Sequence, residues 1–196
     1  MQVTFNGNLF PERFNCQILY PTEIAKYFLK EKQYDDVEEI CYYALLGNMA
    51  HPQLRRELFN YAFCASIFGK GEISSYLKRS TEMVAQYHSS EIINGILDNN
   101  IELNTIPAKE ITNLSFDYLK IFGDRIGSGF LKENNKIINI QSENENNWQY
   151  KDGILFFINK KDEISSIYQE KILINEKIYY AGFFIKTYVC HILKKK

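Results

Sequence analysis

The spacing of apolar residues changes part-way along the chain. From Thr22 to about Leu97, apolar positions recur every three or four residues, which is the period of a helix with one buried face. Beyond Gly127 they come in short segments rich in Ile, Phe and Tyr, which are typical of strands. The pattern predicts an α+β fold, with a helical-hairpin domain over residues 1–100 and an antiparallel sheet domain with one leading helix over residues 101–196.

Five helices are expected in the first half, after a short hairpin that turns at Asn6-Gly7. The second helix has Asp35 as a predicted N-cap and Glu38 three residues later, the spacing of a capping box. The third helix opens at Pro52 and is apolar on both faces, so we expect it at the centre of the helical layer and ending at Gly69. The others are expected from Thr22, from Gly71 to about His88, and over Glu91 to Leu97 with Ser90 as N-cap.

The second half is predicted to begin with a helix over about Asn113 to Phe122, because Leu114, Tyr118 and Ile121 fall on one side of a helical wheel. The turns that follow are too short for parallel crossovers, so the sheet should be antiparallel. Two segments are apolar on both faces, which predicts central strands covered by helices or by a second copy in a homodimer. Strands are expected at 136–141, 147–150, 154–158, 164–168, 171–174, 178–185 and 188–193.

The two helical hairpins between residues 22 and 88 resemble tetratricopeptide-type repeats. The resemblance rests on Tyr34 in the first inter-helix turn, Ala44 in the second helix and Pro52 at the start of the next hairpin. The first helix lacks the Trp and the Leu-Gly pair of that family. The resemblance implies stacked hairpins with a concave face that binds peptides or partner proteins, and no residue matches a ligand-contacting motif.

Composition and charge exclude several classes of function. Hydrophobic residues make up 45% and charged residues 24%, an ordinary globular mixture. The net charge of −1 provides no field for nucleic acid, and no apolar run reaches the ~20 residues that would insert into a membrane. The N-terminus does not look like a secretory signal, and four separated cysteines indicate buried free thiols. We therefore expect a cytoplasmic protein.

Neither metal-binding nor catalytic spacing is recognisable. His51, His88 and His191 lie far apart, and the glycine-bearing segment at 123–129 lacks the Lys-Ser/Thr of a phosphate loop, which favours a structural turn. Cys190 and His191 are adjacent, but neighbouring strand residues point to opposite faces and do not readily form a nucleophile and base. The sequence predicts no catalytic residue, no metal and no cofactor.

Four residues are candidates for partner binding. Arg55 and Arg56 open the third helix on a turn expected to be exposed, where cations oppose the helix dipole, so contact with a partner would explain them. Trp148 and Tyr150 share one strand face amid amide side chains, which suits a sugar or a peptide. The alternative is that these two aromatic residues anchor the core.

These observations favour a non-enzymatic protein-binding module, such as a bacterial or phage adaptor, a chaperone or a toxin-neutralising partner, because stacked hairpins present extended surfaces. The alternative is an accessory or glycan-binding component of a bacterial carbohydrate-processing, glycosyltransferase-like system. Its support is the stretch from Trp148 to Phe157, W-x-Y-x-D-G-x-L-F-F, which resembles small β-domains attached to bacterial sugar-processing proteins.

Overall fold

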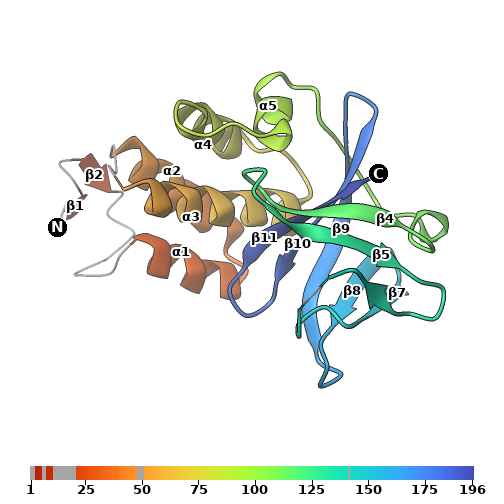
Figure 1. Cartoon of the computed structure of the whole chain (residues 1–196). Helices are drawn as coiled ribbons and strands as arrows, with labels where there is room; N and C mark the ends of the chain where they lie inside the picture. Colours follow the sequence, from red (N-terminus) through yellow and green to blue (C-terminus); the bar gives the residue numbers. More distant parts are fainter. Residues whose placement is uncertain (1–2, 6–7, 11–20, 48–50, 141) are drawn as a thin grey trace. The chain divides into compact units, whose positions relative to one another are not determined.

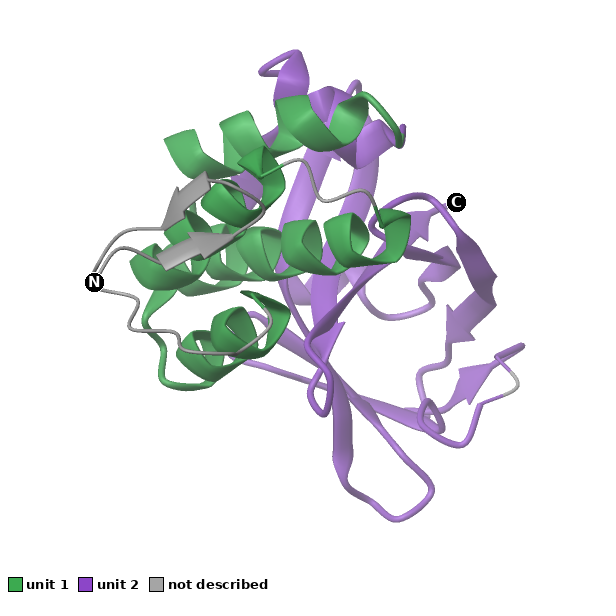
Figure 2. Ribbon diagram, turned by 90° about the vertical axis from the view of Figure 1, so that its left-hand side faces the viewer, with its two compact units in different colours: residues 1–88 green, residues 89–196 purple. Residues whose placement is uncertain are grey.

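The computed structural model describes residues 3–5, 8–10, 21–47, 51–140 and 142–196. The chain divides into two compact units, residues 1–88 and residues 89–196 (Figure 2). The first is helical, and the second is built around an antiparallel sheet (Figure 1), which confirms the α+β fold. The division lies ahead of the expected boundary at residue 100, so the fifth helix belongs to the second unit.

The described part of the helical unit contains two short strands, four α-helices and a π-helix. β1 (Val3–Phe5) and β2 (Asn8–Phe10) pair antiparallel, while the expected turn at Asn6-Gly7 lies outside the described residues. The helices are α1 (Pro21–Lys30), α2 (Tyr34–Leu46), α3 (Pro52–Phe63) and α4 (Ser75–Ala85). α1 packs on α2 and α3 packs on α4, so successive helices form hairpins.

α3 lies at the centre of the helical unit, as its two apolar faces predict. It contacts α1, α2 and α4. Leu58, Phe59 and Phe63, which come from both faces, are completely buried. The helix continues as a π-helix, η1 (Cys64–Lys70), and ends at Gly71, whose φ of 68° suits a glycine. The expected end at Gly69 is therefore within two residues of the observed one.

The start of α2 differs from the prediction. Gln33 is the N-cap residue, and no side chain caps the helix. Glu38 is instead completely buried, where it accepts hydrogen bonds from Ser74 Oγ and, at 3.0 Å, from Lys70 Nζ. The capping-box prediction is wrong because this carboxylate has partners from distant segments. Lys70 also pairs with Asp35 at 2.9 Å.

The second unit contains one antiparallel sheet with the strand order β6-β5-β4-β11-β10-β9-β8-β7, and β3 pairs with β9 beside this path. The antiparallel prediction is confirmed, although the two strands expected at 164–168 and 171–174 are one continuous strand, β9. The strands are β3 (Glu102–Asn104), β4 (Ser115–Lys120), β5 (Arg125–Leu131), β6 (Ile137–Ile138), β7 (Asn147–Lys151), β8 (Ile154–Ile158), β9 (Ile164–Ile174), β10 (Lys177–Phe184) and β11 (Val189–Lys195).

β4 replaces the helix predicted over residues 113–122. Phe116 and Tyr118 are buried while their neighbours are half-buried or exposed, which is the period of a strand. The helical-wheel grouping misled because Leu114 precedes the strand and Ile121 lies in the turn that follows it. Aromatic residues at alternate positions favour a strand, and β4 pairs with both β5 and β11.

The sheet curls until its two ends meet. β4 and β8 have three strands between them, a separation of ~19 Å in a flat sheet, yet the rings of Phe116 and Phe157 are 6.2 Å apart. Lys136, next to β6, forms a bridge with Asn147 of β7, so the end strands touch. The interior is filled by an apolar cluster that includes Phe116, Tyr118, Leu131, Trp148, Leu155, Phe157, Tyr168, Tyr180 and Leu193.

One end of this interior is closed. The segment before β4, with the short 3-10 helix η2 (Ala108–Glu110), contributes the buried residues Ile106, Ile111 and Leu114 to the apolar cluster. Glu110 binds Lys171 at 2.7 Å and accepts a hydrogen bond from Tyr180 at 2.9 Å. The opposite end, where β4 and β11 carry Lys120 and His191, is not closed in this way.

A helix covers part of the outer face of the sheet. α5 (Glu91–Leu97) begins after Ser90, whose hydroxyl accepts a hydrogen bond from the Ile93 amide, as the N-cap prediction requires. Gly95 allows a close approach to β9, because a Cβ at this position would lie 2.8 Å from the Ile174 side chain. The second apolar face of the central strands is therefore covered in part by the chain's own helix.

Candidate functional site

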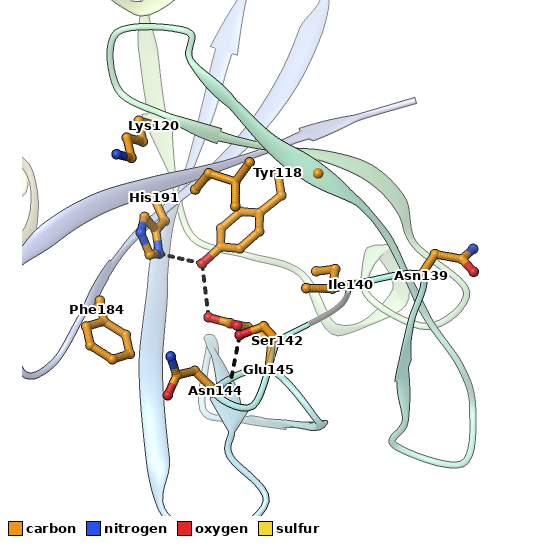
Figure 3. Close-up of a pocket in the computed structure, with 11 residues that line it drawn as sticks. Tyr118, Lys120, Asn139, Ile140, Ser142, Asn144, Glu145, Phe184 and His191 are labelled. Carbon is orange, nitrogen blue, oxygen red and sulfur yellow. Dashed lines mark hydrogen bonds between the residues drawn. The ribbon is translucent and has the colours of Figure 1, made fainter.

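The open end of the curled sheet contains a cavity of about 530 Å³ (Figure 3). Its lining comes from β4, β5, β10, β11 and the connection between β6 and β7, so segments far apart in the sequence meet here. The apolar part of the lining is Ile126, Ile140 and Phe184, and the amide and hydroxyl part is Asn139, Ser142 and Asn144. This volume falls in the usual range of small-molecule sites.

The register of the strands brings the remaining polar residues together. His191 pairs with Lys120 of β4, so both side chains leave the same face, and Tyr118 is a diagonal neighbour whose ring meets the imidazole edge-on at 4.9 Å. Gly182 pairs with both His191 and Tyr168. A Cβ on Gly182 would lie 2.5 Å from the Tyr168 ring, so the glycine makes room for that ring.

Three side chains form a hydrogen-bonded chain in the cavity wall (Figure 3). The Tyr118 hydroxyl lies 2.5 Å from His191 Nδ1 and donates to Glu145 Oε1 at 3.2 Å. A hydroxyl has one proton, so donation to Glu145 makes it the acceptor of the proton on Nδ1, and Nε2 keeps its lone pair. Nε2 makes no hydrogen bond to a described residue. It is therefore available as an acceptor.

Burial sets the protonation states of this chain. Loss of water, and secondly the charge of Lys120, lowers the pKa of His191 to about 4, so the imidazole is neutral at pH 7. Loss of water, and secondly the charge of Glu145, raises the pKa of Tyr118 well above its ordinary value, so the phenol stays protonated. The wall thus presents a neutral imidazole and a neutral phenol in front of the buried carboxyl group of Glu145.

Two more hydroxyl groups lie behind Tyr118. Ser166 and Tyr168 of β9 are completely buried. Their hydroxyls are close enough to Tyr118 to lower its pKa, although burial raises that pKa by more. Neither completes a hydrogen bond of good geometry to any residue that the structure describes. The two hydroxyls extend the polar end of the cavity wall into the interior of the sheet.

A smaller cavity, of about 360 Å³, lies beside α5 on the outer face of the sheet. Its charged residues are largely paired with one another. Glu91 binds Lys177 and Lys194 and accepts a hydrogen bond from Tyr179, and these contacts outweigh burial and lower its pKa to about 2. The contacts account for the charges without a ligand.

Trp148 and Tyr150 lie in the core of the sheet unit. Trp148 is 7% exposed and its Nε1 donates to the Lys132 carbonyl at 2.9 Å. The Tyr150 hydroxyl donates to the Ile106 carbonyl at 2.7 Å, and its ring packs on the apolar cluster. Both side chains therefore have the environment of core anchors, the alternative interpretation of this pair. The nearby amide of Asn144, by contrast, lines the cavity.

Arg55 and Arg56 lie in the helical unit, so the structure does not bring them into the cavity. Arg55 is only 8% exposed, which corrects the expectation that it lies on an exposed turn. Its guanidinium carbon is 3.8 Å from the centre of the Tyr87 ring, which is 56% exposed. Burial, and then Arg56 and Arg55, lower the pKa of His88, so both arginines lie near that histidine.

The sequence patterns did not reveal the three residues of the hydrogen-bonded chain. The periodicity around Tyr118 predicts a helix, and Glu145 lies among asparagines in a segment with no periodicity. Cys190 and His191 point to opposite faces of β11, as strand geometry predicts: Cys190 is completely buried, and His191 faces Tyr118. A histidine among alternating apolar residues was the one available signal.

The glycine-bearing segment forms the end of the turn after β4 and most of β5, so only its first residues are the expected turn. Gly123 has a φ of 84° in the turn between β4 and β5. Gly129 lies within β5, where a Cβ would be 2.3 Å from the Phe116 ring. Both glycines therefore have a role in the fold.

The expectations on thiols, metals and membranes concern residues in both units. Cys41, Cys64 and Cys190 are free and buried as predicted, and Cys16 lies outside the described residues. Within the described parts of the chain, no three His, Cys, Asp or Glu side chains are grouped to hold a metal ion. None of the described helices combines the length and the apolarity needed to span a bilayer.

Comparison of the chain with models of known protein families, with curated proteins and with solved structures finds no match. The resemblance to tetratricopeptide repeats implies stacked helical hairpins. The helices of the first unit do form hairpins, and no family match identifies them as such repeats. The function is therefore argued from the geometry of the cavity.

Proposed function

We propose that the protein is a non-enzymatic binding module whose sheet unit holds one saccharide unit of a glycan in the cavity. The observation that carries this proposal is the hydrogen-bonded chain of Glu145, Tyr118 and His191, which lines the cavity together with apolar side chains such as Phe184. A pyranose ring has the matching character, because its C–H face is apolar and its hydroxyls donate and accept hydrogen bonds around the rim.

Each part of the cavity has a role in this proposal. Phe184 supplies a flat apolar surface for the C–H face of the sugar. His191 Nε2 accepts a hydrogen bond from a sugar hydroxyl, and the amides of Asn139 and Asn144 both donate and accept. A few fixed polar groups in a mostly preformed cavity give orientation and specificity.

Binding is favoured over catalysis by the surroundings of His191. Its hydrogen-bond partner is Tyr118, a phenol whose pKa is raised, so it is a poor nucleophile. Among the described residues, no serine, threonine or cysteine side chain is hydrogen-bonded to the imidazole. The hydrogen-bonded chain orients an acceptor and does not activate a nucleophile.

Titration calorimetry on the full chain tests this proposal with glucose, galactose, N-acetylglucosamine, glucuronate and galacturonate. At least one should bind, and Phe184→Ala should reduce the affinity by tenfold or more, the loss typical of a contact aromatic residue. Phe183→Ala is the matched control, because Phe183 lies on the opposite face of β10 and stacks on Tyr188. Equal losses in the two variants, or no binding by any of the five sugars, would reject the proposal.

A second candidate function, capture of a protein partner, is favoured by the stack of Arg55 on Tyr87 in the helical unit. The arginine holds the exposed ring in place before any partner arrives, and arginine and tyrosine are the residue types that dominate interface energies. Stacked helical hairpins commonly present such surfaces.

Tyr87→Ala tests this second candidate, with Tyr27→Ala as the matched control, since Tyr27 is similarly exposed at 58% in the same unit. Partner recovery on an affinity column should fall at least tenfold in Tyr87→Ala and remain unchanged in the control. Equal recovery with both variants would remove the Arg55–Tyr87 surface as a candidate.

A further inference from the structure

We propose that the saccharide is acidic, a uronic acid whose carboxylate pairs with Lys120 while its hydroxyls face the Glu145 end of the cavity. This inference rests on the proposed function, since it names the class of sugar that the same cavity takes.

Lys120 is the cation in the cavity that lacks a partner. Its Nζ makes neither an ion pair nor a side-chain hydrogen bond to a described residue. Two half-buried lysines of the same unit have carboxylate partners: Lys171 binds Glu110 at 2.7 Å, and Lys194 binds Glu91 at 2.6 Å. Lys120 also borders the smaller cavity, whose carboxylates already have cationic partners.

The other titratable groups in the cavity do not neutralise Lys120. His191 is its cross-strand neighbour and is itself neutral, because burial and the Lys120 charge disfavour its protonated form. Glu145 is buried and accepts the hydrogen bond of Tyr118. A ligand with one negative charge could therefore form an ion pair with the ammonium group of Lys120.

The positions of the charges fix the orientation of such a ligand. Lys120 and Glu145 lie at opposite ends of the group of side chains in Figure 3, with Tyr118 and His191 between them. A ligand carboxylate is attracted to the Lys120 end and repelled from the Glu145 end. Hydroxyl groups suit the Glu145 end, because the carboxyl oxygens of Glu145 and the Asn144 carbonyl accept hydrogen bonds.

A uronic acid matches this cavity better than a phosphorylated or a neutral sugar. A phosphate monoester carries close to two charges at pH 7 and is usually held by several cations or by a helix N-terminus. Lys120 and the buried, neutral His191 supply one charge. A neutral sugar would leave Lys120 without a partner, and a uronic acid supplies one carboxylate together with several hydroxyls.

Calorimetry with paired probes tests the inference. Glucuronate and galacturonate are compared with glucuronamide and galacturonamide, which have the same shape without the charge. We expect at least one uronate to bind the wild type at least tenfold more tightly than its amide, the size expected of one hydrogen bond between charged groups. Lys120→Gln should remove this preference and leave affinity for the amide within about twofold, while Lys151→Gln, at an exposed position of β7 outside the cavity, should keep it.

The outcomes separate this inference from the proposed function. If a uronate and its amide bind equally to the wild type, or if Lys120→Gln retains the preference, the acidic-sugar inference is wrong and the saccharide site stands. If neither acids nor amides nor neutral sugars bind, both fail. Lys120 is exposed, so a melting temperature like that of the wild type should show that the Lys120→Gln variant is folded.

Discussion

Among the residues that the structure describes, each unit buries one glutamate, and the two glutamates have different surroundings. Glu38 in the helical unit is completely buried and receives hydrogen bonds from Ser74 and Lys70. Glu145 in the sheet unit is 5% exposed and is bound by Tyr118, beside a cavity and in front of two hydroxyls for which the described residues supply no well-formed hydrogen bond. The first arrangement is closed, and the second is open toward a space that a ligand can fill.

This difference is the one expected between a structural polar network and the binding site that we propose. A buried charge whose oxygens are all engaged by the protein contributes to holding its segments together, and here Glu38 joins α2 to η1 and α4. The network at Glu145 ends at His191 Nε2, an acceptor that no described residue binds, and a ligand could supply its hydrogen bond. We therefore expect substitutions at Glu38 to affect stability and substitutions around Glu145 to affect binding.

The largest expected effect is in the closed core of the helical unit. Phe63→Asp places an unpaired charge at a completely buried position between helices and should abolish soluble expression. Tyr27→Asp, at an exposed position of α1, is the control and should remain soluble. Solubility and thermal melting measure the outcome, and a Phe63→Asp protein that melts like the wild type would contradict a central position for α3.

Trp148→Ala should cost about 3–5 kcal/mol of unfolding free energy, as expected for a large aromatic residue removed from a core. Trp148→Phe, which keeps most of the ring but loses the bond to the Lys132 carbonyl, should cost distinctly less. Urea denaturation measures both variants. A Trp148→Ala protein of wild-type stability with lost sugar binding would move this residue from the core into the site.

The two glutamates provide the direct test of the comparison. Glu38→Gln should lower the free energy of unfolding by about 2–3 kcal/mol, because Lys70 and Ser74 would then face a neutral amide in place of the carboxylate that they bind. Glu145→Gln should lose about 1 kcal/mol or less, because the amide oxygen still accepts from Tyr118. Chemical denaturation gives the two values, and the reverse order would mean that Glu145 belongs to the closed network.

The smallest expected effect concerns acid. The pKa of His191 is lowered from 6.5 to about 4, so the unfolded chain takes up this proton first as the pH falls. The neutral His191 makes its full contribution to the free energy of unfolding above pH 6.5, and this contribution is lost between about pH 6.5 and pH 4. When the pH falls from 7 to 5, the free energy of unfolding should therefore decrease in the wild type by about 1–2 kcal/mol more than in the His191→Gln variant. Parallel pH profiles would show that His191 is not buried in its neutral form.

The fold was predictable where the local pattern and the tertiary environment agree. The two apolar faces of α3 predict its central position, and Ser90 predicts the start of α5. β4 was misassigned because Leu114, Tyr118 and Ile121 happen to satisfy a helical period, while its pairing with β11 is decided by residues more than 70 positions away. Local periodicity contains no information on such a partner.

The candidate site was not predictable, for a similar reason. His191, Tyr118 and Glu145 come from β11, β4 and the connection before β7, and only the curl of the sheet brings them together. Trp148 has the composition of a sugar-binding residue but the environment of a core residue. Residue types can suggest that a side chain suits sugar binding. The strand register decides which side chains reach the cavity, as it does for Tyr118 and His191.

The most direct test of the central claim is a long-range ¹H–¹⁵N spectrum of the three histidine imidazoles, recorded at pH 7 while glucuronate or galacturonate is added. His191 should show a neutral ring with the proton on Nδ1, and its Nε2 signal should shift as the sugar binds. His51 and His88, which lie in the helical unit, are internal controls and should not move. If the His191 signals remain unchanged while sugar binding is detected by calorimetry, the cavity at the open end of the sheet is not the binding site.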